Sequence, residues 1–233
     1  DDLQLIMDKP SIYLLDQDMR SLSMTGLQFG DTVFGRNAEL STVIGAYRRS
    51  VSGESENEVV TIWGQSGTGK SLLAIEFGMH VLSSGGIFIF GKFDQLQQGK
   101  PFSALASAFD QYCGMMMQNC ELRHKLAHQV NNVLGRDAYH LAKLIPNLAR
   151  ILGLDMMNPI NQDDDCINAQ RRLQYLLRRF VEVLSNTCAA PVVLFLDDLQ
   201  WADPSSIAAV NHLLLTEGPT AHNSRFFFFG CNR

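Results

Sequence analysis

The chain has 233 residues, 46% of them hydrophobic, which is enough to bury the core of one α/β domain with a small appendage. Its net charge of −5 argues against a nucleic acid as the main partner, because phosphate contacts require clustered Lys and Arg side chains. We find no signal peptide and no apolar run long enough to cross a bilayer, and we therefore expect a cytoplasmic protein.

The cysteines are odd in number and form no C-x-x-C pair, so we expect reduced, mostly buried thiols and no zinc site. They are Cys113, Cys120, Cys166, Cys188 and Cys231. Because the chain opens on Asp1 rather than Met, we expect it to be part of a longer protein. Residues 1–30 show no clean period and are predicted to be a linker or docking segment. Apolar residues at helical spacing then predict a helix over 37–49.

The central feature of the sequence is a glycine-rich loop between an apolar run, Val59–Trp63, and a helical pattern that starts at Leu72. It matches the G-x-x-x-x-G-K-[ST] pattern of a phosphate-binding P-loop. The loop's three glycines are predicted to adopt backbone angles that a side chain would forbid, so that successive N–H groups surround an anion. We expect Lys70 to reach the β- and γ-phosphates of a nucleoside triphosphate and Ser71 to bind Mg²⁺. The predicted nucleotide-binding residues are Gly64, Gln65, Ser66, Gly67, Thr68, Gly69, Lys70, Ser71 and Leu72.

The middle of the chain is predicted to be mainly helical. After a break at Gly85-Gly86, residues 87–90 are typical of a buried strand. Helices are expected over 101–118, 121–134 and 136–152, the last interrupted near Pro146. An acidic segment, 161–165, is expected to cap a further long helix. Four arginines lie mostly off its apolar stripe: Arg171, Arg172, Arg178 and Arg179. We expect them to be solvated or paired, with one near a phosphate or a neighbouring domain as the alternative.

A second chemical site follows the apolar run 191–196, which is typical of a buried parallel strand. Ligands of open α/β sheets bind at the carboxyl ends of such strands. We therefore predict that Asp197 holds Mg²⁺ and that Asp198 orients the attacking water. Asp203 is expected to cap the next helix. Residues 225–229 form another apolar run, and the candidate γ-phosphate sensors after it are Asn232 and Arg233.

Several strings in the chain together resemble the AAA-type, origin-recognition-like ATPase modules of the STAND class. The most specific is Leu194–Asp203, with sequence LFLDDLQWAD. The others are 34–40, the P-loop, 91–95 with 101–105, and the terminal Gly230–Arg233. Such modules occur in large signalling proteins that carry kinase, sensor histidine kinase or nucleotide cyclase domains.

The resemblance implies an α/β P-loop NTPase fold over 31–233. Its parallel sheet would have five strands, with the P-loop strand beside the sensor strand. A helical insertion would separate strand 2 from the strand that ends in Asp197. The resemblance also implies that Gly35 and Arg36 lie near the adenine, and that Asn232 and Arg233 act near the γ-phosphate together with Lys70 and Asp198.

Two features depart from the family pattern. The sensor strand usually ends in Tyr-Arg, whereas this chain has Asn232-Arg233. The family's helical lid would follow Arg233, so the domain is expected to be truncated before it. For the chain as it stands we expect weak, Mg²⁺-dependent binding of ATP in preference to AMP, and slow hydrolysis.

The leading hypothesis is a Mg-ATP-binding regulatory ATPase module that switches a larger signalling protein. Its partners would be neighbouring kinase, histidine kinase or cyclase domains, and it could self-associate when nucleotide is bound. The main alternative is a module that binds nucleotide as a structural ligand without hydrolysing it. A small-molecule phosphotransferase is less favoured because no substrate pocket is evident, and a DNA-loading ATPase is disfavoured by the acidic charge balance.

Overall fold

The computed structural model describes residues 35–54, 57–97, 100–155, 166–186, 191–214 and 226–233. The predicted linker at 1–30 and the acidic segment at 161–165 lie outside these ranges, as do Phe34 and the first residue predicted for the last strand. Within the described residues no helix is long and apolar enough to cross a membrane.

A four-stranded parallel sheet forms the centre of the fold. Its strands are β1 (Asn57–Trp63), β2 (Ile87–Lys92), β3 (Val192–Asp197) and β4 (Phe226–Asn232), in the order β1-β4-β3-β2. Every neighbouring pair is parallel. The expected neighbourhood of the P-loop strand and the sensor strand is confirmed by the β1–β4 pair. The expectation of five strands was wrong for the described residues, because no strand of these ranges pairs with the outer edge of β1.

The described helices follow the predicted pattern closely. One lies before the P-loop and one directly after it, and the predicted insertion between β2 and β3 is confirmed as five helices. The helices are α3 (Asn37–Ser52), α4 (Lys70–Ser83), α5 (Ser103–Met116), α6 (Cys120–Leu134), α7 (Ala138–Leu144), α8 (Pro146–Leu152), α9 (Cys166–Ser185) and α10 (Pro204–Leu214). Short 3-10 turns are η1 (Gln95–Gln97), η2 (Gly135–Asp137) and η3 (Leu199–Trp201).

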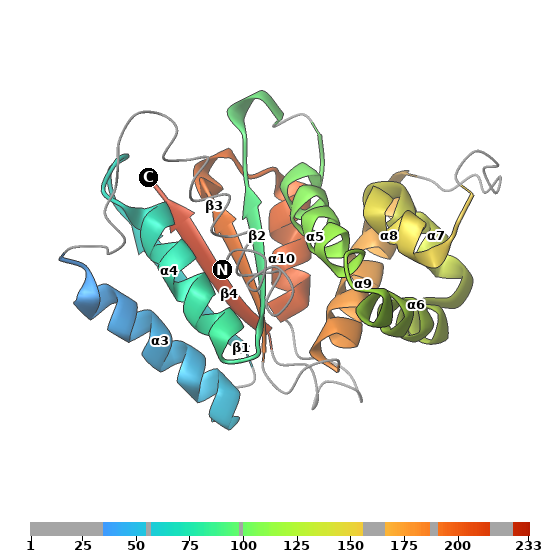
Figure 1. Cartoon of the computed structure of the whole chain (residues 1–233). Coiled ribbons are helices and arrows are strands. Elements are labelled where there is room, and N and C mark those ends of the chain that lie inside the picture. The colour runs from blue at the N-terminus through green and yellow to red at the C-terminus, as the bar shows by residue number, and fades with distance from the viewer. Residues whose placement is uncertain (1–34, 55–56, 98–99, 156–165, 187–190, 215–225) are drawn as a thin grey trace.

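The sheet lies between two helical layers (Figure 1). On one face α3 and α4 pack over Phe227, Phe229 and Phe195. On the other face α5, α9 and α10 pack over a second apolar cluster that includes Phe226 and Phe228. Consecutive phenylalanines of β4 therefore serve opposite cores, as the two-residue period of a strand requires. Helices α6, α7 and α8 extend this second layer away from the sheet (Figure 1).

The arginines of α9 are engaged in structural ion pairs where partners are described. Arg172 lies 2.6 Å from the Asp137 carboxylate, and Arg178 and Arg179 both pair with Glu182 on the same helix. Asp203 caps α10 as predicted, because its carboxylate accepts a hydrogen bond from the Ser206 N–H at 2.9 Å.

Candidate functional site

The predicted site residues gather at one edge of the sheet because all four strands are parallel. The strand register sets Trp63 beside Asn232 and Lys92 beside Asp197. The carboxyl ends of the strands therefore meet at the edge where α4 begins (Figure 1). Segments far apart in the sequence thereby contribute to one site.

The P-loop connects β1 to α4, and two of its three glycines use conformations that disfavour other residues. Gly67 and Gly69 both have φ of 80°, and Gly69 immediately precedes the first residue of α4. The prediction was wrong for Gly64, whose φ is not positive. A Cβ at Gly64 would lie 3.4 Å from the Thr68 hydroxyl oxygen and 3.9 Å from the Lys70 side chain, so it would be in contact with the inside of the loop.

Lys70 is held inside the loop by its own backbone. Its ammonium donates hydrogen bonds to the carbonyl oxygens of Gly64 at 2.6 Å and Gln65 at 2.8 Å. Only 8% of the residue is exposed. These bonds offset the cost of burying the charge and place a fixed cation at the start of α4.

The two predicted Mg²⁺ ligands are in direct contact. The Ser71 hydroxyl donates a 2.7 Å hydrogen bond to the Asp197 carboxylate, which is 5% exposed. The other Asp197 oxygen accepts the Asp198 N–H at 2.9 Å. A hydroxyl and one carboxylate suit Mg²⁺ at a nucleotide site, since this ion takes few protein ligands and completes its shell with phosphate and water. The described residues contain no cluster of three or more His, Cys, Asp or Glu side chains that could hold a metal.

Asp198 has an unusual backbone and several partners. Its φ of 54° places it in the left-handed region, at the start of η3. The Gln200 amide donates to one carboxylate oxygen at 2.8 Å, and Arg233 lies 3.3 Å from the same oxygen. Lys92 lies 3.5 Å from the other oxygen. The group predicted to orient water is thus flanked by two cations.

The remaining predicted residues lie around this core. The Asn232 side-chain oxygen accepts the Arg233 N–H at 2.9 Å, and the Gln200 side-chain oxygen accepts the same N–H at 3.2 Å. Gly35 has φ of 86°, and the Arg36 carbonyl begins the hydrogen bonding of α3. Their predicted roles toward nucleotide stay predictions.

Cys231 is a site neighbour that the sequence analysis treated only as a core thiol. It is fully buried in the apolar cluster beneath α4. Burial, followed by the charge of Asp197, raises the pKa of Cys231 to about 12, while the charges of Lys70 and Arg36 act in the opposite direction. The thiol therefore stays protonated, and the charges that act on it are those of the site.

Lys92 and Gln200 were also missed as site residues. Lys92 could have been found with the rule that identified Asp197, because it ends a buried parallel strand. The sequence analysis ended that strand at Phe90, before Gly91, whereas β2 continues through Lys92. Gln200 lies within the quoted LFLDDLQWAD string but gave no chemical signal of its own.

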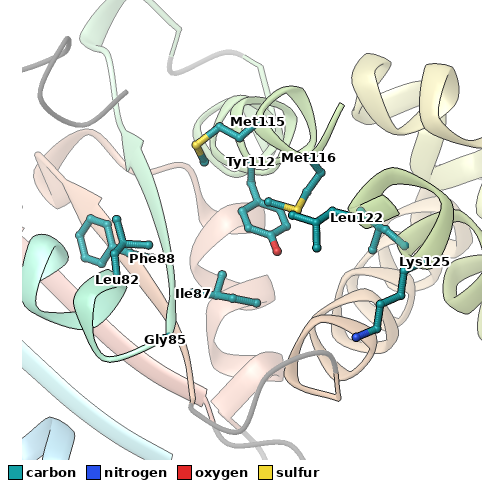
Figure 2. A pocket seen from close by; sticks show the side chains of 11 residues that line it. Leu82, Gly85, Ile87, Phe88, Tyr112, Met115, Met116, Leu122 and Lys125 are labelled. Carbon is teal, nitrogen blue, oxygen red and sulfur yellow. The ribbon is translucent and has the colours of Figure 1, made fainter. Parts of the chain in front are cut away.

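A cavity of about 250 Å³ lies elsewhere, beside β2 (Figure 2). Tyr112, Met115 and Met116 of α5 line it together with Leu122 and Lys125 of α6. Figure 2 shows the Tyr112 hydroxyl and the Lys125 ammonium pointing toward its middle. None of its lining residues belongs to the P-loop or to the carboxyl ends of the strands, so the cavity is separate from the candidate site.

Comparisons with known proteins agree with this arrangement. A family model described as "AAA ATPase domain" matches residues 32–226. The chain is also 29% identical over 184 residues to "Hybrid signal transduction histidine kinase G" from Dictyostelium discoideum. That alignment covers 78% of this chain but only 5% of the relative, so the chain spans a small part of the relative's length.

Proposed function

The chain belongs to the AAA ATPase domain family, and on this premise we propose that it is a Mg-ATP-binding regulatory ATPase module. The observation that supports this most is the contact between Ser71 and Asp197, at 2.7 Å. It joins the helix after the P-loop to the tip of a buried strand, where a Mg-nucleotide site requires its oxygen ligands.

Each residue has a proposed role that its position can support. Lys70 would neutralise charge on the β- and γ-phosphates, while the N–H groups of the loop and of the α4 N-terminus surround them. Ser71 and Asp197 would hold Mg²⁺, which when bound supplies positive charge to the phosphates. Asp198 would orient water, and Asn232 with Arg233 would sense the γ-phosphate. Gly35 and Arg36 are proposed to contact the adenine side.

We propose that nucleotide binding switches a larger signalling protein of the STAND class. The histidine kinase relative supports this setting, because the similar segment is a small part of a much longer chain. The proposed partners are neighbouring kinase, histidine kinase or cyclase domains, with self-association as a possible consequence of nucleotide binding. In this setting the nucleotide state, rather than turnover itself, would be the signal.

A binding measurement tests the core of this proposal. We expect Lys70→Ala to weaken binding of a fluorescent ATP analogue in the presence of Mg²⁺ by at least about 10-fold, because a charge-assisted contact contributes roughly 1.5–3 kcal/mol. Lys125→Ala, on an exposed part of α6, is the matched control and should bind as the wild type does. Equal affinities of the wild type and Lys70→Ala would remove the P-loop from the proposal.

A second candidate function is a module that binds ATP as a structural ligand without hydrolysing it. The observation that favours it is the pairing of Asp198 with Lys92 and Arg233, which occupies the carboxylate that would otherwise face water. The discriminating experiment compares phosphate release by the wild type and by Asp198→Asn. A rate that is absent in the wild type and unchanged in the variant would favour this second candidate over the ATPase.

A further inference from the structure

We propose that Lys92 is a positioning residue that fixes the orientation of the Asp198 carboxylate. Its catalytic consequence rests on the proposed ATPase function, while the contact itself does not. Lys92 is the last residue of β2 and lies in register with Asp197. Its ammonium lies 3.5 Å from one oxygen of Asp198.

The backbone of Asp198 is already fixed by neighbours in the chain. Its N–H donates to the Asp197 carboxylate at 2.9 Å, and its carbonyl accepts the Trp201 N–H at 3.0 Å. These bonds hold a non-glycine residue at φ of 54°, a conformation that needs such support. The freedom left to Asp198 is therefore rotation of its side chain.

Partners on opposite sides of the carboxylate restrict that rotation. Gln200 and Arg233 share one oxygen, at 2.8 Å and 3.3 Å. Lys92 is the described partner of the other. If Arg233 is removed, the first carboxylate oxygen of Asp198 keeps its hydrogen bond from Gln200. If Lys92 is removed, the second oxygen has no cation near it among the described residues. Lys92, whose side chain is 57% exposed, is therefore the described cation that faces the second oxygen.

The packing of η3 explains how these partners meet. A Cβ at Gly230 would lie 2.5 Å from the Leu199 side chain, so the glycine lets η3 pack directly on β4. This brings Gln200 within 3.2 Å of the Arg233 N–H. Only 15% of the Asp198 side chain is exposed, so its charge needs nearby cations. One cation comes from β2 and the other follows β4, and the carboxylate lies between them.

The kinetic test uses variants that keep the length of the side chain. Lys92→Met is expected to lower kcat for ATP hydrolysis by roughly 10- to 100-fold, because misplacing a catalytic group by about 1 Å can have this effect. KM for ATP should change by less than about 2-fold, since Lys92 is proposed to act through Asp198 rather than on nucleotide. Lys92→Arg should restore most of kcat, and Lys125→Met should leave it unchanged.

A second measurement needs neither nucleotide nor turnover. Urea unfolding of Lys92→Met, Asp198→Asn and the double variant forms a double-mutant cycle. We expect the effects to be non-additive, with Lys92→Met destabilising the wild type more than it destabilises Asp198→Asn. Additive effects would overturn the proposed contact.

The outcomes also separate this inference from the function on which it rests. Normal wild-type turnover with an unchanged kcat in Lys92→Met would overturn the role of Lys92 and leave the ATPase intact. Binding of ATP by the wild type with no turnover at all would overturn hydrolysis and the catalytic consequence of Lys92, while the double-mutant cycle would still test the contact. A lowered kcat that Lys92→Arg rescues, together with a non-additive cycle, supports the proposal.

Discussion

Gly91 is the residue that allows the site-bearing end of β2 to lie close to both β3 and α5. A Cβ at this position would lie 2.7 Å from the Leu196 side chain and 3.1 Å from the carbonyl oxygen of Ala104. The Leu196 side chain could move aside, but the Ala104 carbonyl oxygen could move only if α5 shifted. The predicted strand ended before Gly91, whereas in the structure Gly91 is part of β2. This glycine allows close packing and does not form a turn.

We therefore expect Gly91→Ala to destabilise the protein by about 1–3 kcal/mol, the usual cost of overpacking a buried site. Urea unfolding followed by circular dichroism measures the effect. Gly45→Ala is the matched control, since Gly45 lies within α3 with nothing within 4 Å of an added Cβ. It should stabilise the protein by up to about 1 kcal/mol. Equal effects of the two variants would contradict the packing argument.

Residue chemistry was the most predictable part of the candidate site. Lys70, Ser71 and Asp197 were predicted because their residue types suit a phosphate and Mg²⁺ site, and the structure brings the last two into contact, while their roles toward nucleotide stay predictions. The partners of Asp198 were not identified. Lys92 and Arg233 reach it through strand register, which individual residue types do not reveal.

At the scale of elements, α5 and α8 are joined by a part-buried polar link. The Asp110 carboxylate accepts hydrogen bonds from the Asn147 N–H at 2.6 Å and from the Asn147 side-chain amide at 3.0 Å. Asn147 is the second residue of α8 and follows Pro146, so Asp110 satisfies a donor at the start of that helix. An acidic group also interacts favourably with the positive end of the helix dipole.

Removing this link should weaken the helical insertion. We expect Asp110→Ala to destabilise the protein by about 1–3 kcal/mol, because the part-buried Asn147 N–H loses its described acceptor, while the Asn147 side-chain amide keeps its 3.1 Å hydrogen bond to the Asp110 carbonyl oxygen. Gln111→Ala, at the exposed neighbouring position, should change stability by less than about 0.5 kcal/mol. Thermal unfolding of both variants provides the comparison, and a neutral Asp110→Ala would show that Asn147 finds another partner.

Helices were predictable as elements because their apolar residues recur at helical spacing over many positions. The interruption near Pro146 was confirmed as the boundary between α7 and α8. How these helices pack against one another was harder to predict from the sequence. The link between Asp110 and Asn147 joins helices separated by α6 and α7, and neither residue differs in type from an ordinary solvated one.

At the scale of the whole molecule, the parallel sheet could be predicted from continuous apolar runs that end in polar residues. The position of β4 beside β1 could be predicted only from the family resemblance. The same resemblance implied a fifth strand, and the described sheet has four. Long-range order of this kind depends on how helices cover both faces, which no single segment encodes.

Cys231 links the stability of the whole fold to nucleotide binding. It is fully buried, and burial raises its pKa to about 12, so its native thiol is both inaccessible and protonated. Alkylation by iodoacetamide should therefore require opening of the sheet beneath α4. Peptide mass spectrometry should find Cys231 modified far more slowly than the exposed Cys120.

Mg-ATP at about 100 times its Kd should slow this modification further, because a ligand of the native state alone stabilises it by about 2.7 kcal/mol at that concentration. The rate at Cys231 would fall by up to about 100-fold where modification proceeds through global unfolding, while the rate at Cys120 would not change. At the same ATP concentration, Lys70→Ala should lose most of the protection. Modification of Cys231 as fast as Cys120 would contradict its burial, and protection that survives in Lys70→Ala would place the nucleotide elsewhere than the P-loop.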